Sequence, residues 1–259
     1  MTDTTSSSRF GPWPGIGTRL VDDAEAIGYV VALPPECRTL TSEPARRGDI
    51  LSLDRGHRVA VAGAGAANAA AAAETLVAQG ARRLVSWGCA GALCDELLPG
   101  DLVIPRELIF ADGTTVHLAG PWHERLLTRL QPTTPIRTES MTESIGIVGS
   151  STAKRNLHAA SGAIATDMES GAVTRTAEKY GLPCLAIRSI VDAAAVTLPR
   201  AAQAALDSDG ELIVNRLLLQ LLWTPTEIAP LLRLGRAFRR AMQTLSAVKT
   251  HAGLGLGQP

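Results

Sequence analysis

The sequence lacks several features that would define a functional class. Lys and Arg together number 25, as do Asp and Glu, so there is no overall field that favours nucleic acid. No segment approaches the roughly 18 to 20 uninterrupted apolar residues of a membrane span. The polar, turn-rich start of the chain has no charged-then-apolar signal sequence. We therefore expect a cytoplasmic protein that does not bind nucleic acid.

Patterns of paired cysteines and of metal ligands are missing too. The five histidines have no HExxH or comparable spacing, so we predict no metal. The cysteines have no CxxC spacing, which favours reduced thiols in a cytosolic protein. There are four of them: Cys37, Cys89, Cys94 and Cys184.

Length and composition indicate a folded α/β protein. The 259 residues are 46% hydrophobic, enough for one large domain with a full core. We predict a flexible tail over 1–24, a catalytic domain over 25–222 and a basic amphipathic extension over 223–259. Apolar runs predict strands at 27–33, 58–63, 83–88, 144–149 and 184–191, and helical patterns include 198–222.

The most informative stretch runs from Ala165 to Ala194. It predicts a helix that starts beside Glu169 and stops at Gly181, followed by a buried strand that ends at Asp192. Such a helix and strand bring both carboxylates, 23 residues apart, to the edge of an α/β sheet where ligand crevices form. Taken singly, each carboxylate is more typical of a helix first turn or of a strand end.

A Gly-x-Gly turn between a strand and an Ala-rich helix invites a dinucleotide-binding interpretation. That interpretation is weak, because Asn68 stands at the third glycine position and the next strand ends without an acidic residue for a ribose. We expect a tight turn around Gly65 that packs on the substrate side. Glu36 follows the first strand directly, where a carboxylate is usually a solvated loop residue.

Together these motifs resemble the nucleoside phosphorylase and nucleosidase superfamily. The matching segments are Asp167-Met168-Glu169, Arg188 to Asp192 and Pro99 to Ile104, with a turn of small residues expected at Cys89-Ala90-Gly91-Ala92. The resemblance implies a single-domain α/β fold with a central mixed β-sheet flanked by helices. It also implies an N-ribosyl bond-cleaving enzyme that assembles as a homo-oligomer.

The resemblance also implies a role for each matching residue. Asp192 is the expected general acid at the purine, and Glu36 stands where the hydrolases place their water-activating Glu. The expected substrate-binding residues are Asp167, Met168, Glu169, Cys89, Ala90, Gly91, Gly65 and Ser150, with Glu169 on the ribose hydroxyls. No cofactor is implied. Inorganic phosphate stays open as a co-substrate, because Arg38 is near Glu36, although water is favoured.

Within the superfamily, the chain is similar to the hopanoid-associated phosphorylase subfamily. The segments that carry this resemblance are DMESGAV, RSIVDAA and LLRLGRAFRRA, and the resemblance covers Ile27 to about Ala247. It implies release of adenine from adenosylhopane, leaving a ribosyl or phosphoribosyl hopane. The basic amphipathic segment after Leu231 either packs on its own domain or lies on an anionic membrane surface. A methylthioadenosine- or futalosine-type nucleosidase is the nearest alternative. A non-catalytic binding protein and a Rossmann dehydrogenase are less well supported.

Overall fold

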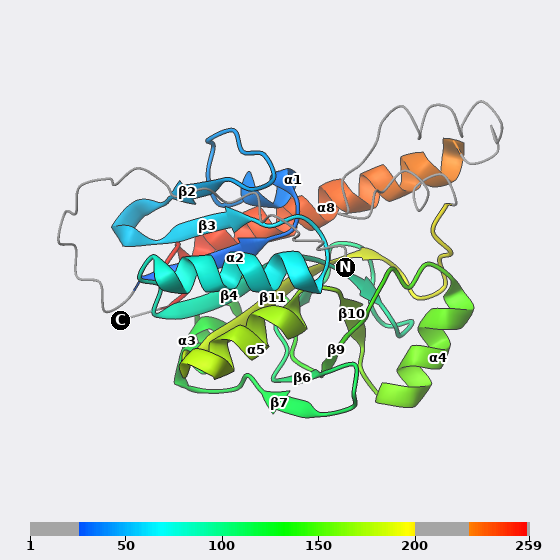
Figure 1. The fold of residues 1–259 in the computed structure, drawn as a ribbon. Coiled ribbons are helices and arrows are strands. Elements are labelled where there is room, and N and C mark those ends of the chain that lie inside the picture. Colours follow the sequence, from blue (N-terminus) through cyan, green and yellow to red (C-terminus); the bar gives the residue numbers. More distant parts are fainter. Residues whose placement is uncertain (1–25, 200–227, 258–259) are drawn as a thin grey trace, which may run out of the picture.

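The computed structural model describes residues 26–199 and 228–257 (Figure 1). The strands are β1 (Ile27–Val31), β2 (Ile50–Ser52), β3 (Arg58–Val61), β4 (Arg83–Ala92), β5 (Leu102–Val103), β6 (Glu107–Ile109), β7 (Thr115–His117), β8 (Ile136–Arg137), β9 (Met141–Glu143), β10 (Ala165–Asp167) and β11 (Cys184–Asp192). The helices are α1 (Pro34–Cys37), α2 (Ala66–Ala78), α3 (Pro121–Leu130), α4 (Ser151–Ser161), α5 (Ser170–Tyr180) and α8 (Ile228–Ala252), with a 3₁₀ turn at Asp54–Gly56.

In the described part of the chain the strands form one mixed sheet of eleven strands built around β4. Strand β4 pairs in parallel with β11 along most of its length, from Leu84 to Gly91. Its other partners are β1, which is parallel to its first half, and β10, which is antiparallel to its end. The sheet therefore branches at β4, with β10-β9-β6-β7 on one branch and β11-β5-β8 on the other. The parallel strands β1, β3, β4 and β11 end at one edge, where ligand crevices form in α/β sheets.

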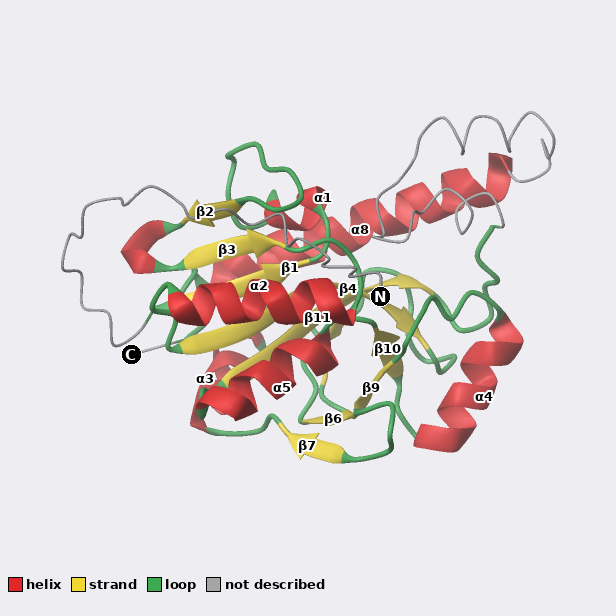
Figure 2. Ribbon diagram, viewed as in Figure 1, coloured by secondary structure: helices red, strands yellow, loops and turns green. Residues whose placement is uncertain are grey.

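Helices cover both faces of the sheet (Figure 2). On one face α2 packs against α5, and their small buried residues, such as Ala73 and Ala177, let the two helices and the sheet approach closely. Strand β1 contributes Gly28, where a Cβ would lie 2.9 Å from that of Leu76. On the other face the last half of α8 buries Leu245 and Val248 in the main core with α3 and β11. These layers confirm the predicted fold, a mixed sheet flanked by helices.

Two predicted elements are wrong. No strand forms over 144–149. The N–H of Ser144 donates to the Asp167 carbonyl at 2.8 Å, and the chain then leaves the sheet. Ile145 and Ile147 imitate a strand in the sequence, but Ile145 is 92% exposed. The predicted turn at Cys89 to Ala92 is instead the second half of β4, which pairs with β10.

The predictions for the first strand and for the C-terminal segment can be compared with the structure, whereas two others fall outside the described residues. The first strand ends at Val31, two residues earlier than predicted, and Pro34 and Pro35 start the short helix α1, because proline is tolerated in a helix's first turn. The predicted tail over 1–24 lies outside the described residues. The predicted helix over 198–222 also lies outside them, except for its first two residues. The amphipathic segment after Leu231 is helical, and its last part packs on the domain.

Candidate active site

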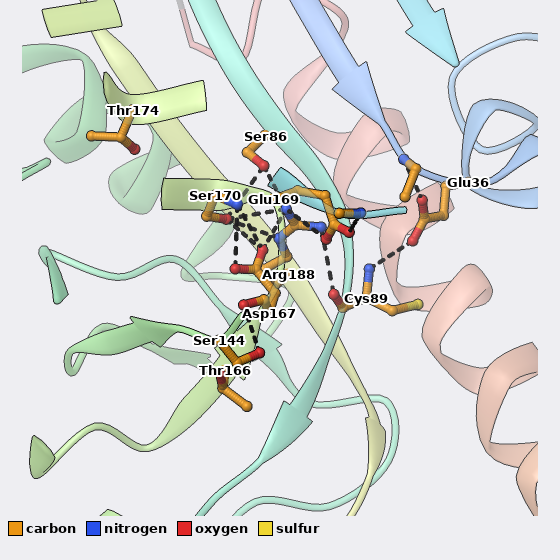
Figure 3. Close-up of polar contacts among 12 residues, drawn as sticks. Glu36, Ser86, Cys89, Ser144, Thr166, Asp167, Glu169, Ser170, Thr174 and Arg188 are labelled. Atoms are coloured by element: carbon orange, nitrogen blue, oxygen red, sulfur yellow. Dashed lines mark hydrogen bonds and ion pairs between the residues drawn. The ribbon is translucent and has the colours of Figure 1, made fainter. Parts of the chain in front are cut away.

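Four acidic side chains and one arginine gather at the edge where the parallel strands end. Glu36 lies in α1 after β1, Glu169 lies between β10 and α5, and Asp192 ends β11. Arg188, also on β11, lies between Glu36 and the Asp167–Glu169 pair (Figure 3). Segments more than 100 residues apart in the sequence thus converge on one polar cluster.

Glu36 is held by the backbone rather than exposed in a loop. Its side chain lies in the site with only 2% of the residue accessible. Oε2 accepts hydrogen bonds from the N–H groups of Ala32 at 3.0 Å and Leu33 at 2.9 Å. Oε1 accepts one from the N–H of Cys89 at 2.9 Å (Figure 3). Burial raises the pKa of this carboxyl, which Arg188 and the N–H donors partly oppose. A carboxylate so fixed and so desolvated suits a general base.

Glu169 is tied to the Gly-rich turn. Its Oε1 accepts a hydrogen bond from the N–H of Gly65 at 2.8 Å, and Gly65 has a φ of 97°, which a side chain would strain. Burial, and next the charge of Asp167, raise the pKa of Glu169 to about 7. A tight turn is therefore present at Gly65, and its backbone N–H holds the Glu169 carboxylate, whereas contact of Gly65 with substrate stays a prediction.

Arg188 is buried beneath these carboxylates. Its Nη2 lies 2.5 Å from Oδ2 of Asp167 and 4.0 Å from Oε2 of Glu169. The guanidinium also donates to the hydroxyls of Ser86 and Ser170 and to the carbonyl of Cys89. This planar fork uses its donors within the protein, so it fixes the geometry of the acidic residues.

Asp167 faces the protein interior. Its carboxylate pairs with Arg188 and accepts hydrogen bonds from the N–H of Ser170 and, at 2.6 Å, from its hydroxyl. These bonds satisfy donors at the start of α5, as an N-cap does. Asp167 was predicted to bind substrate, but its described contacts are with Arg188 and Ser170.

Asp192 lies at a bulge where β11 ends beside β4. It is 6% exposed and pairs with the Nζ of Lys154 on α4. Burial raises the pKa of Asp192, and the Lys154 charge opposes this rise. Gly91 is its neighbour on β4, where a Cβ would lie 3.3 Å from Oδ1.

The other predicted residues lie in different settings. Met168 is half-buried, with its methyl group 3.9 Å from where a Cβ of Gly65 would lie. Cys89 is partly exposed beside Glu36, whereas Ala90 is buried in the core under the sheet. Ser150 has an exposed side chain that caps α4 by accepting from the N–H of Ala153 at 3.1 Å, so its predicted substrate contact stays untested.

Sequence reasoning gave no role to Arg188, Lys154 or Ser86. The signal for Arg188 was a charged residue inside an apolar strand, because a fully buried arginine must be paired. Lys154 gave no such signal, since a lysine on a polar helix is normally solvated.

This fold and this acidic cluster define an α/β enzyme with a carboxylate-based site at the edge of its sheet. A sequence model of the Phosphorylase superfamily matches residues 27–219. The chain therefore belongs to that superfamily, and the predicted class, a phosphorylase- or nucleosidase-type enzyme, is confirmed at this level. No curated protein gives a significant sequence match.

Several solved structures share the fold. Futalosine hydrolase of Helicobacter pylori is 16% identical with a TM-score of 0.66, covering 88% of this chain and 97% of its own. The 5'-methylthioadenosine/S-adenosyl homocysteine nucleosidase of the same organism is 16% identical with a TM-score of 0.65 and the same coverages. The Neisseria meningitidis nucleosidase, in complex with methylthio-immucillin-A, is 16% identical with a TM-score of 0.66, again covering 88% and 97%.

The described residues contain neither a membrane-spanning helix nor a cluster of metal ligands. Within 26–199 and 228–257 no helix has the length and hydropathy needed to cross a membrane. In the same ranges no three His, Cys, Asp or Glu side chains group as metal ligands, and the absence of a metal stays a prediction.

Proposed function

We propose that this protein cleaves the N-glycosidic bond of a 5′-substituted adenosine, adenosylhopane, and releases adenine. The observation that carries the proposal is the convergence of Glu36, Glu169 and Asp192, all buried, at one edge of the sheet. Membership of the Phosphorylase superfamily supports the reaction class. The wording of the segments from Asp167 onward supports the hopanoid substrate.

Each carboxyl has a separate task in the proposed reaction. Asp192 donates a proton to N7 of the purine as the C1′–N9 bond breaks and its electron pair goes to the departing base. Glu169 accepts hydrogen bonds from the ribose hydroxyls, which strengthen as positive charge develops on the sugar. Glu36 takes a proton from water as the water oxygen bonds to C1′. Met168 packs on the apolar face of the sugar.

The charge balance of the site favours water over phosphate. Glu36, Asp167 and Glu169 surround Arg188, whose donors are already engaged by protein acceptors. A phosphate dianion would meet three carboxyl groups there, with like charges close by. Arg38, which kept phosphate open, is exposed. We therefore propose hydrolysis to ribosylhopane, with no cofactor.

The first half of α8 supports a lipid substrate. Ile228 and Leu232 are 47% and 58% exposed there, and Arg233, Arg236 and Arg239 are exposed along the same segment. In Figure 1 this part of α8 extends beyond the sheet. Apolar and basic groups together suit contact with an anionic lipid surface. We propose a cytoplasmic protein that contacts the inner face of the cell membrane and assembles as a homo-oligomer.

A methylthioadenosine- or futalosine-type nucleosidase is the alternative. The three carboxylates would serve a small nucleoside equally well, and the proteins of similar fold named above carry those activities in their names. This alternative leaves the exposed basic part of α8 without a role.

The test is adenine release, followed by chromatography, from adenosylhopane and from methylthioadenosine, each with and without inorganic phosphate. We expect release from the lipid nucleoside, independent of phosphate and reduced by about 100-fold or more in Asp192→Asn. Equal or faster release from methylthioadenosine would establish the alternative. A requirement for phosphate would overturn the hydrolytic mechanism, and no release from either substrate would overturn the proposed function.

A further inference from the structure

Lys154 is a buried cation for which the proposed reaction has so far given no role. It lies on α4, 1% exposed, and its Nζ meets three acceptors. They are Oδ2 of Asp192, the carbonyl of Ala193 at 2.9 Å and the carbonyl of Val196 at 3.0 Å. An ammonium group has three N–H donors, so all are used within the protein. Lys154 therefore has no donor left for a substrate.

We propose that Lys154 is a positioning residue for N-glycosidic cleavage, which holds Asp192 by one oxygen and stabilises the carboxylate that forms when Asp192 gives up its proton. This inference rests on the proposed function. It adds a specific partner for the general acid, contributed by α4 and not by the strands that carry the other acidic residues.

The geometry around Asp192 separates its two oxygens. Oδ2 accepts the hydrogen bond from Lys154. Both oxygens lie close to Gly91, since a Cβ there would be 3.3 Å from Oδ1 and 3.5 Å from Oδ2, so the Lys154 bond is what distinguishes them. Because the ammonium engages Oδ2, we infer that Oδ1 carries the proton to be donated.

The same lysine connects α4 to the segment that follows β11. Ala193 and Val196 form a turn closed by a 3.0 Å hydrogen bond, and Lys154 donates to both of their carbonyls. Next to this turn, the N–H of Leu198 donates to the Gly149 carbonyl at 2.7 Å, beside the start of α4. Displacing Lys154 would therefore release both Asp192 and this turn.

The proton balance of the step is simple. Asp192 loses a proton to N7 as the C1′–N9 electron pair moves to the base, and the resulting carboxylate lies against the Lys154 ammonium. The titratable groups that face Asp192 are Lys154 from α4 and the Cys89 thiol from β4. Burial raises the pKa of that thiol well above its usual value, so the thiol stays neutral. The ammonium is then the charge that controls Asp192.

The experiment compares Lys154→Met and Lys154→Arg with the wild type, each also in an Asp192→Asn background. Because Asp192 must be protonated to act, activity falls on the alkaline side as it ionises. Removing the ammonium disfavours ionisation of Asp192. Lys154→Met should therefore shift the alkaline limb of the kcat/KM profile to higher pH, by about one pH unit or more. It should lower kcat by about 10-fold or more while KM changes by less than about threefold. Lys154→Arg should retain the wild-type limb.

In the Asp192→Asn background, Lys154→Met should have no more than about a twofold further effect, because it acts through Asp192. Lys179→Met is the matched control, since Lys179 is an exposed lysine paired with Glu74. It should leave the rate and the pH profile unchanged. An unshifted alkaline limb, or an equal loss of kcat in both backgrounds, would overturn the inference.

A second readout does not depend on turnover. The carboxyl carbon signal of Asp192, assigned by its loss in Asp192→Asn, can be titrated by NMR in the wild type and in Lys154→Met. The Asp192 pKa should rise in the variant. If the wild type releases no adenine, the proposed function fails while this titration still tests the pair. An unchanged pKa in an active enzyme overturns the inference alone.

Discussion

Gly88 lies directly against Glu36 in the site. A Cβ on residue 88 would lie 2.5 Å from Oε1 of Glu36, and 2.7 Å from Nη1 of Arg188. Both contacts are shorter than a carbon and a polar atom tolerate. Neither neighbour can move freely, because three backbone N–H groups hold Glu36 and several acceptors hold Arg188. The site therefore depends on a missing side chain in β4.

Gly88→Ala should abolish most activity while the protein still folds. The added methyl group must displace the Glu36 carboxylate, and loss of a general base costs about 100-fold or more in kcat. Overpacking should lower the free energy of unfolding by about 1–3 kcal/mol. Adenine release and urea unfolding measure the two effects. Gly235→Ala is the control. Residue 235 is helical, and an added Cβ there would have no described neighbour within 4 Å outside the backbone of its own helix, so this variant should keep its activity. Full activity in Gly88→Ala would contradict the role of Glu36.

Glu169→Gln should change stability in a pH-dependent way. With a native pKa near 7, the wild type loses stability as pH rises from about 4.5 to 7, because the unfolded state releases in this range a proton that the folded state keeps. Glutamine keeps an acceptor for the Gly65 N–H and has no charge to bury. The variant should thus gain stability relative to the wild type across this window, by up to about 3 kcal/mol at pH 8.

Urea unfolding of the wild type and Glu169→Gln at pH 5, 6, 7 and 8 measures this difference. Its growth with pH is the expected result. A difference that stays constant would mean that the pKa of Glu169 is not raised in the folded protein. Activity should fall in the variant most clearly above pH 7, where Glu169 of the wild type is ionised, because a neutral amide stabilises a positive sugar less than a carboxylate does.

Arg188→Met should be among the most destabilising single substitutions at the site. It leaves Asp167 and Glu169 buried without their counter-charge, which costs about 3–5 kcal/mol. Arg188→Lys should cost less, because it keeps the charge but not the fork that reaches Ser86 and Ser170. Urea unfolding ranks the variants. Arg38→Met, on an exposed arginine, should stay within about 0.5 kcal/mol of the wild type. Equal losses of stability in the two Arg188 variants would contradict the role of the counter-charge, because lysine keeps the charge and loses only the fork.

Much of the fold could be predicted from the sequence, because local patterns specify its elements. The apolar runs of β1, β3 and β11 and the Ala-rich α2 lie where expected. The failures came where tertiary contacts decide. Strand β4 continues past Gly88 because β11 stays paired with it as far as Gly91 and β10 pairs with its last residues. The segment after Glu143 has strand-like periodicity but finds no neighbouring strand to pair with.

The candidate site was predictable for residues at the ends of strands. Glu36 follows β1 and Asp192 ends β11, and the carboxyl ends of such parallel strands meet at one edge of the sheet. Glu169 follows β10, which runs antiparallel to β4, so its place in the site depends on that pairing. Lys154 was not predictable. Its reach to Asp192 depends on how α4 packs after a loop, and the spacing of 38 residues carries no periodic signal. A residue whose role depends on pairing with a side chain of a distant element can be recognised only from the structure.

The exposed arginines of α8 allow the membrane proposal to be tested without unfolding the domain. Removing the helix would also remove Leu245 and Val248 from the core, so charge substitution is the better change. Arg233, Arg236 and Arg239 replaced together by Gln should weaken binding to anionic phospholipid vesicles by about 100-fold, at about 1 kcal/mol for each charge. Turnover of a lipid nucleoside in those vesicles should fall, while turnover of any nucleoside accepted in solution should not. The matched control replaces Arg38, Arg55 and Arg82, exposed elsewhere, and produces the same net charge. If both triple variants bind vesicles alike, net charge alone governs the attraction and α8 does not contact the membrane.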